Sequence, residues 1–331
     1  MRLVVLLSSA GSVSDSHTTV HLLSAALARG HAVRVVEPWD IDVDERGRVQ
    51  MRAFILDGMD PDRAVLAEAL RARAPVRRTV AANDHDVLCL RINPLDTAVL
   101  AFAQLAGRAG LRVVNDPDGL LVATHKSWLA SLPADVPRPR GVVTRSLAVA
   151  ERFASGERGG VVVKPARASG GRGVGLVRGG EGELASAVDA ASRAGDGWVV
   201  VQAYLPEASA GEKRLLWLDG ELIGGYLRMR PPGDFRHNLR RGATPEPCEV
   251  DAADRAAVRA LDPHLRRAGV WFAGLDLIGG RLVEVNVLNP GGAHFTTVLG
   301  GLPVGERLVG ALEALGSPRG TDYHNRGETN R

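Results

Sequence analysis

The start of the chain alternates short apolar runs with helical stretches, and this alternation restricts the fold more than any other feature. The expected strands lie at 3–7, 32–36, 87–91 and 111–114, and the expected helices at 18–29 and 97–109. Strands that read as continuous apolar runs and alternate with helices are typical of a parallel sheet covered by helices. The first part of the chain therefore predicts an α/β domain.

The rest of the chain predicts two further units, which suits a length of 331 residues. Their expected elements are a helix at 120–132, a strand at 161–165, a helix at 181–193, a strand at 198–202, strands at 214–218 and 221–228, a helix at 252–268 and a hairpin at 272–287. We expect an N-terminal domain at 1–118, a central subdomain at 119–202 and a C-terminal subdomain at 203–315. The polar, glycine-rich segment 316–331 reads as a disordered tail.

Composition excludes several classes of protein. The net charge is +3, but arginines alternate with carboxylates and aromatic residues make up 4%, so the basic, aromatic-rich surface of a nucleic-acid binder is not expected. No run of apolar residues is long enough to span a membrane, and no cleavable leader is evident. Cys89 and Cys248 are far apart and read as thiols of a reducing compartment, so we expect a cytoplasmic protein.

Lysine is rare in this chain, which makes each lysine a candidate functional residue. Only Lys126, Lys164 and Lys213 are lysines among the 41 lysines and arginines. An ammonium group is a compact charge that reaches a phosphate oxygen in a slot too narrow for a guanidinium. The alternative is that the three lysines are ordinary surface residues.

The hairpin at 272–287 carries carboxylates within apolar strands. Glu284 and Asn286 are two residues apart and share a face, and with Asp276 they would make an all-oxygen site suited to Mg²⁺. A two-residue Gly279-Gly280 turn would put Asp276 and Glu284 on opposite faces, so we expect an odd number of turn residues, most simply three. The alternative is the solvated face of an edge hairpin.

A glycine-rich segment follows the strand that ends at Lys164. It contains four glycines in the eight residues 168–175, and glycine lets backbone N–H groups approach an anion closely. No Gly-Lys-Ser/Thr follows, so the segment is not a Walker motif, and a simple turn would look similar.

Taken in order, these segments resemble the ATP-grasp ligases, and most closely the bacterial glutathione synthetase family. The resemblance covers about residues 2–315 through Lys126, 161–165 with its glycine loop, 202–206, 211–214, 236–239 and 274–286. It implies an ATP-grasp fold of the α/β class, with an N-terminal Rossmann-like pre-ATP-grasp domain, a central lid subdomain and a C-terminal α+β subdomain. It also implies ATP as co-substrate, two Mg²⁺ ions for which Mn²⁺ could substitute, small-molecule acid and amine substrates, and a homodimer or homotetramer.

The resemblance also implies roles for individual residues. ATP would be bound by Lys126, Lys164, Ser169, Gly170, Gly171, Gly173, Gln202, Ala203, Tyr204, Leu205 and Glu212. The metal ligands would be Asp276, Glu284 and Asn286, and the catalytic cations Arg214, Arg228 and Arg236. The substrates would be bound by Arg91, Asn238, Asn289, Gly291 and Gly292. The implied reaction activates a carboxylate as an acyl phosphate, which an amine then converts to an amide.

Two segments depart from the family pattern. Residues 287–294 read Val-Leu-Asn-Pro-Gly-Gly-Ala-His where the family has Val-Thr-Ser-Pro, and the segment 90–97 is one residue shorter. The alternatives are therefore an ATP-grasp peptide or amide ligase of a specialised pathway with another donor or amine, and a non-catalytic ATP-binding regulatory module. The complete set of metal ligands and phosphate lysines argues against the module. The roles of Lys213 and His294 stay open.

Overall fold

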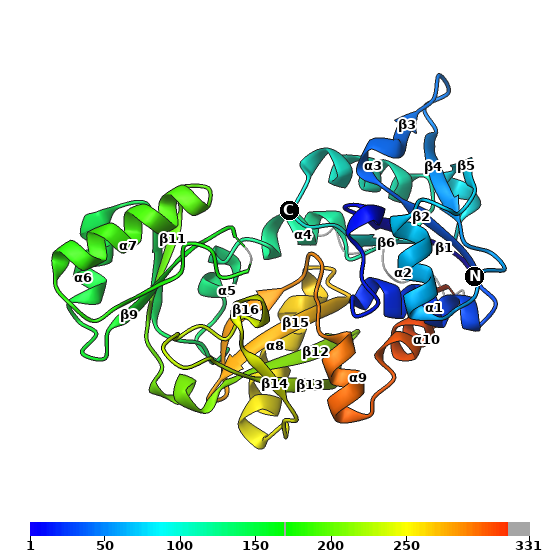
Figure 1. Ribbon diagram of the computed structural model, residues 1–331. Coiled ribbons are helices and arrows are strands. Elements are labelled where there is room, and N and C mark those ends of the chain that lie inside the picture. The colour runs from blue at the N-terminus through cyan, green and yellow to red at the C-terminus, as the bar shows by residue number, and fades with distance from the viewer. Residues whose placement is uncertain (169, 317–331) are drawn as a thin grey trace, which may run out of the picture.

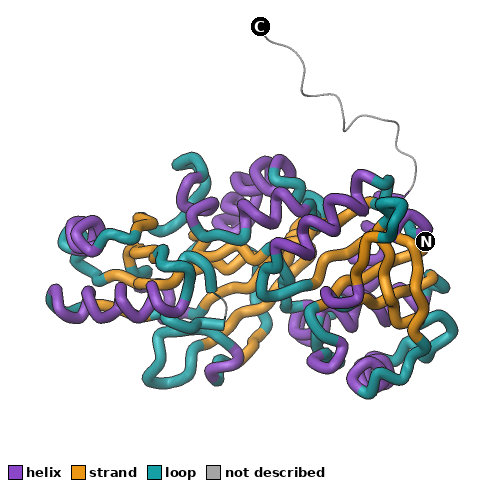
Figure 2. Tube along the Cα trace, turned by 90° about the horizontal axis from the view of Figure 1, so that it is seen from above, coloured by secondary structure: helices purple, strands orange, loops and turns teal. Residues whose placement is uncertain are grey.

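A computed structural model describes residues 1–168 and 170–316. Ser169 and the predicted tail from residue 317 onward lie outside the described residues. Three sheets follow one another along the long axis of the molecule (Figure 2). The N-terminal and central sheets lie at opposite ends, and the C-terminal sheet lies between them (Figure 1).

The N-terminal sheet has seven strands in the order β3-β4-β2-β1-β6-β7, with β5 beside β4. Its elements are β1 (Arg2–Leu7), α1 (Thr18–Ala28), β2 (Ala32–Val36), β3 (Ile41–Val43), β4 (Val49–Ile55), α2 (Arg63–Arg71), β5 (Arg77–Ala81), β6 (Val87–Arg91), α3 (Thr97–Arg108) and β7 (Arg112–Val114). The pairs of β1 with β2 and β6, and of β6 with β7, are parallel as predicted. Strands β3, β4 and β5 add an antiparallel extension that the sequence did not predict.

The helix predicted at 120–132 is wrong, because the structure has two short helices there. Helix α4 (Pro117–Ala123) is capped by Asp116, whose side chain accepts hydrogen bonds from the N–H groups of Asp118 and Gly119. Helix α5 (Ser127–Ser131) follows after a break. Lys126 stands in this break, where its N–H donates to the carbonyl oxygen of Ala166 on the central sheet side (3.1 Å). The break therefore places Lys126 beside the central sheet.

The central sheet is antiparallel, in the order β10-β9-β11-β8. Its elements are β8 (Gly141–Thr144), α6 (Leu147–Ala154), β9 (Val161–Pro165), β10 (Gly175–Val177), α7 (Glu181–Ala194) and β11 (Val199–Ala203). Valines of β9 and β11 make a small separate core with α6 and α7. The glycine-rich segment connects β9 to β10.

The C-terminal sheet is also antiparallel, in the order β14-β13-β12-β15-β16. Its elements are β12 (Glu212–Leu218), β13 (Glu221–Met229), β14 (Thr244–Glu246), α8 (Ala252–Arg267), β15 (Phe272–Ile278), β16 (Arg281–Asn286), α9 (Ala293–Gly300) and α10 (Val304–Gly316). Helix α10 leaves this sheet and packs on α1 of the N-terminal domain, in one shared core. The domain boundaries at 118, 202 and 315 stay predictions.

Candidate active site

The hairpin β15–β16 brings Asp276 opposite Glu284, but not in the way that the sequence predicted. Gly279 and Gly280 form a two-residue turn at φ 54° and 71°, so the expected odd-numbered turn is wrong. The register shifts after the pair Leu277–Leu282, and Val283 is the extra residue of a β-bulge. A two-residue turn alone would pair Asp276 with Val283. The extra residue of the bulge shifts the pairing by one position, so Asp276 pairs with Glu284 and Gly274 with Asn286.

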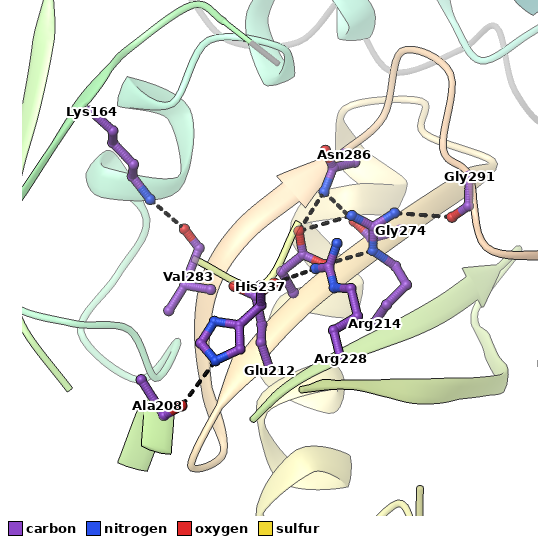
Figure 3. Close-up of polar contacts among 11 residues, drawn as sticks. Lys164, Ala208, Glu212, Arg214, Arg228, His237, Gly274, Val283, Asn286 and Gly291 are labelled. Atoms are coloured by element: carbon purple, nitrogen blue, oxygen red, sulfur yellow. Dashed lines mark hydrogen bonds and ion pairs between the residues drawn. The ribbon is translucent and has the colours of Figure 1, made fainter. Parts of the chain in front are cut away.

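Two arginines hold Asp276, one from the neighbouring strand β12 and one from the next strand, β13. Arg214, its cross-strand partner on β12, donates from Nε to Oδ1 (2.6 Å) and from Nη2 to Oδ2 (2.9 Å). Arg228 on β13 donates from Nη2 to both Asp276 and Glu212. Arg214 and Arg228 therefore point at one carboxylate from adjacent strands (Figure 3).

Burial and charge act against each other on these carboxylates. Burial alone would raise the pKa of Asp276, but Arg214 and Arg228 outweigh it and lower that pKa, so the group is ionised. Burial raises the pKa of Glu212 against the opposing effect of Arg228, with Asp276 adding to the rise. The cluster thus contains one firmly charged carboxylate and one that is easier to protonate.

The oxygen donors around this cluster fit a divalent cation. Glu284 is about one-third exposed, and one of its oxygens contacts Lys126 Nζ (3.2 Å). Asn286 donates through Nδ2 to Asp276 Oδ2 (3.1 Å), and its Oδ1 makes no hydrogen bond to any residue that the structure describes. Over residues 1–168 and 170–316 there is no group of three His, Cys, Asp or Glu that could hold a metal. The candidate set here therefore combines the carboxylates Asp276 and Glu284 with the amide of Asn286. Two carboxylates and an amide oxygen suit Mg²⁺, with Glu284 and Asn286 the most available ligands.

The two lysines near the cluster differ in their surroundings. Lys164 on β9 is 8% exposed, and its Nζ donates to the carbonyl oxygen of Val283, the bulge residue (2.9 Å; Figure 3). Burial lowers the pKa of Lys164 to about 8, although Glu284 opposes the shift. Lys126 Nζ lies between Glu284 and the carbonyl oxygen of Ala168 (3.1 Å). Both ammonium groups therefore face the same oxygen-rich region.

Lys213 is not part of this region. Its Nζ pairs with Asp251 Oδ2 (2.9 Å) and with Asp254, at the capping box that starts α8. Asp254 is almost fully buried, at 1% exposed. The open question about Lys213 thus has a structural answer, because this lysine neutralises a buried carboxylate at a helix end.

Most predicted site residues line one cavity between the central and C-terminal sheets, which we call the first cavity. Those residues are Lys126, Lys164, Gly170, Gly171, Gln202, Ala203, Tyr204, Leu205, Glu212, Arg214, Arg228, Arg236, Asn238, Asp276, Glu284 and Asn286. Arg236 forms an ion pair with Asp234, to which it donates hydrogen bonds through Nε and Nη2. Gly173 does not line this cavity, since it packs against Pro165 and Ala194. Ser169 lies outside the described residues.

The predicted substrate residues line a second cavity of about 890 Å³ that adjoins the first. They are Arg91, Asn238, Asn289, Gly291 and Gly292, and the two cavities share Gly170, Arg172, Arg214, Arg228 and Asn238. The carboxyl end of the parallel strand β1 supplies a wall of hydroxyl groups, and ligands commonly bind at such ends. Arg214 and Arg228 therefore stand where the two cavities meet.

Sequence reasoning missed several of the residues that line these cavities. Ser8, Ser9 and Thr19 line the second cavity, although no site residue was predicted between the strand at 3–7 and the end of the helix at 18–29. The place of Ser8 and Ser9 directly after a parallel strand was the available signal. Leu288 is buried in the core, whereas Asn289 faces the second cavity, so the polar change in this loop lies at Asn289.

Comparison with known proteins identifies relatives along nearly the whole chain. Residues 1–120 match the family described as "Prokaryotic glutathione synthetase, N-terminal domain", and residues 127–298 match "Prokaryotic glutathione synthetase, ATP-grasp domain". A glutathione synthetase of Synechococcus elongatus is 31% identical over 323 residues, 95% of this chain and 99% of the relative. One of Xanthomonas campestris is 33% identical over 290 residues, 87% of this chain and 85% of the relative. The structure resembles the VanG D-Ala:D-Ser ligase from Enterococcus faecalis with a TM-score of 0.65 at 17% identity, covering 95% and 99% of the two chains, which supports the fold alone.

Proposed function

The chain belongs to the prokaryotic glutathione synthetase family and is an ATP-dependent ligase that forms an amide bond; from this we propose that it joins γ-glutamylcysteine to glycine. The ATP-grasp fold and the similarity to glutathione synthetases agree with the resemblance found in the sequence. The identities of the acid and of the amine, the metal ions and the roles of the site residues are parts of the proposal.

The position of Arg214 and Arg228 is the observation that most supports the proposal. Arg214 and Arg228 lie at the junction of two cavities, one with two lysines for phosphates and one with groups for a second substrate. In the proposed reaction, ATP bound in the first cavity and the acid bound in the second meet at this junction. Cations fixed at that point favour the negative charge that develops there.

The proposed reaction has two steps. A carboxylate oxygen of the donor in the second cavity attacks the γ-phosphorus of ATP in the first cavity, and ADP leaves. The amine nitrogen then attacks the carbonyl carbon of the acyl phosphate, loses a proton, and phosphate leaves with the oxygen that came from the donor.

In this scheme Lys126 and Lys164 hold the phosphate oxygens of ATP. Arg214 and Arg228 stabilise first the acyl phosphate and then the oxyanion formed on its carbonyl carbon. Mg²⁺, held by Glu284 and Asn286 with Asp276, would neutralise the β- and γ-phosphates. The backbone of Ala203, Tyr204 and Leu205 contacts the adenine.

The glycine-rich segment would cover the reacting groups and keep water from the acyl phosphate. Gly171 has φ 71°, in the left-handed region that favours glycine, and a Cβ at this position would lie 2.3 Å from Asn238 Oδ1. Contact with Asn238 joins the segment to the loop 230–242 of the C-terminal sheet.

The decisive experiment measures ADP release with Mg²⁺-ATP and γ-glutamylcysteine, with and without glycine, and identifies the products by mass spectrometry. Glycine-dependent release that yields glutathione supports the proposal. Turnover with another acid or amine from a panel would replace these substrates and keep the ligase mechanism. Nucleotide binding with no ADP release from any pair would favour the regulatory module instead.

A second candidate differs only in its amine. Asn289 brings an amide into the second cavity beside Gly291 and Gly292, so an amine with an additional polar group could be accepted instead of glycine. Competition between glycine and serine or β-alanine as acceptors tests this candidate. The cytoplasmic location and the dimer or tetramer remain predictions from the sequence; among the described residues, no helix has the length and apolar character to cross a membrane.

A further inference from the structure

The permanently charged side chains that line the second cavity are all arginines. Five arginines and two histidines line it, and no aspartate or glutamate is found among its described lining residues. The arginines are Arg91, Arg172, Arg214, Arg228 and Arg240, and the histidines are His17 and His294. The other polar lining groups are hydroxyls and amides. Anionic groups are therefore favoured in this cavity, and a cationic group finds no partner of opposite charge on its described walls.

Arg91 differs from the other arginines of the cavity. Arg214 and Arg228 are paired with Asp276, whereas Arg91 has no carboxylate within ion-pair distance in the described part of the chain. Arg172 and Arg240 also lack a carboxylate there, but both are exposed and water solvates them. Arg91 is 5% exposed. A buried charge without a counter-ion is costly, so the chain retains Arg91 at the expense of stability.

Two of the three guanidinium nitrogens of Arg91 donate hydrogen bonds to described residues. Its Nε donates to Thr19 Oγ1 (3.2 Å) and its Nη2 to the carbonyl oxygen of Pro290 (2.9 Å). Its Nη1 makes no hydrogen bond to any described residue. Burial lowers the pKa of Arg91 to about 10, which still leaves it protonated at neutral pH. The group is thus a fixed donor that lines the cavity and has no anionic partner of its own.

We propose that Arg91 binds a carboxylate of the acid donor remote from the reacting carboxylate, and that the cavity does not recognise an ammonium group on that donor. The inference rests on the proposed function. The inference widens the class of acid donors beyond γ-glutamyl compounds. A donor whose remote carboxylate lies as far from the reacting carboxylate as in γ-glutamylcysteine should bind to Arg91, whether or not it carries an amine.

The test compares three donors that differ by one group each, under saturating Mg²⁺-ATP and glycine. γ-Glutamylcysteine has both groups, glutarylcysteine lacks only the amine, and 4-aminobutyrylcysteine lacks only the remote carboxylate. Losing the carboxylate should lower kcat/KM by about 10- to 100-fold, the usual effect of one charge-assisted hydrogen bond. Losing the amine should change kcat/KM by less than about threefold, because no charged partner is lost.

Variants of Arg91 separate recognition from packing. Arg91→Gln should lower kcat/KM for γ-glutamylcysteine and glutarylcysteine by about 10-fold or more and leave 4-aminobutyrylcysteine unaffected, since the missing carboxylate no longer matters. A purely structural role would lower all three equally. Arg112→Gln, on an exposed arginine of β7 outside both cavities, is the matched control. If Arg91→Gln does not fold, the comparison of donors on the unaltered chain decides.

Equal losses from removing the amine and the carboxylate would overturn the inference. If none of the three donors releases ADP, the proposed reaction has failed, and calorimetric binding of the same three compounds to the intact protein with Mg²⁺-ADP tests the inference separately. Binding of glutarylcysteine but not 4-aminobutyrylcysteine then supports it. Binding that needs the amine, or no binding of any of the three, overturns it.

Discussion

Lys164 on the central sheet donates a 2.9 Å hydrogen bond to the carbonyl oxygen of Val283, the extra residue of the bulge in the C-terminal sheet. The two residues are 119 positions apart in the chain. One bond thus connects a lysine that we propose to bind phosphate to the backbone feature that orients the candidate metal ligands. It ties together the two sheets that enclose the first cavity.

Replacement of Lys164 should separate activity from stability. Lys164→Ala removes a buried ammonium that has one carbonyl partner, so ADP release should fall by about 100-fold or more while the Tm stays the same or rises. ADP release and thermal unfolding of the same preparation check this. Full activity in this variant would contradict the assignment of Lys164 to the phosphates.

Replacement of Lys213 should lower stability and leave activity nearly unchanged. Lys213→Met leaves the buried Asp254 without its cation, which should lower the free energy of unfolding by about 1–3 kcal/mol. Activity at 25 °C should stay within about twofold, because Lys213 lines neither cavity. Denaturant unfolding and ADP release measure the two effects. A large loss of activity with unchanged stability would give Lys213 a functional role.

The two candidate metal carboxylates should differ when each is neutralised. Glu284→Gln should abolish turnover with little change in Tm, since Glu284 is about one-third exposed. Asp276→Asn leaves Arg214 and Arg228 without their shared carboxylate, so it should also destabilise the protein by about 3–5 kcal/mol. Thermal unfolding distinguishes the two variants, and equal Tm values would refute the difference in roles.

Loss of Arg228 should affect chemistry more than nucleotide binding. Arg228→Ala should retain ATP binding and lower the rate of ADP release by about 100-fold, because the charge that the arginine stabilises appears in the reaction. Calorimetry gives the affinity for ATP, and a single-turnover assay gives the rate. An unchanged rate would mean that Arg230 or another cation replaces it.

His237 should hold the loop 230–242 over the first cavity. It is the one buried residue of that loop, and its Nε2 lies 2.9 Å from the carbonyl oxygen of Ala208. Arg240 and Arg241 are already exposed, but cleavage by trypsin also requires the surrounding backbone to unfold locally. His237→Ala should release the loop, so trypsin should cleave after these arginines at a rate at least about 10-fold higher. His264→Ala, on α8, is the matched control, and equal cleavage in both variants would show that His237 does not anchor the loop.

The sequence predicted those parts of the fold whose pattern is local. The apolar runs at 3–7, 32–36 and 87–91 became strands because buried parallel strands are apolar on both faces. No strand was predicted at β4, since Arg52 and Gln50 interrupt its apolar residues in the antiparallel part of the sheet. The break at Lys126 was missed because apolar spacing continues through it, and its cause is contact with the central sheet.

Most of the site residues that the sequence indicated line the two cavities, but the sequence did not indicate the contacts between them. The rarity of lysine drew attention to Lys126 and Lys164, which both line the first cavity. It gave no means of separating them from Lys213, whose partners Asp251 and Asp254 lie about forty positions later. The contact of Arg214 with Asp276 joins residues 62 positions apart and depends on strand order. Such a contact arises from tertiary structure, which local spacing does not contain.

The bulge at Val283 has a consequence for how this hairpin can change in length during evolution. Deleting or inserting one residue between Asp276 and Glu284 would turn Glu284 and Asn286 to the opposite side of the sheet, unless a second change restored the count. Changes of two residues in the turn would leave them in place. Related enzymes that keep this chemistry should therefore vary here by even numbers of residues, a constraint on alignment length that no single side chain imposes.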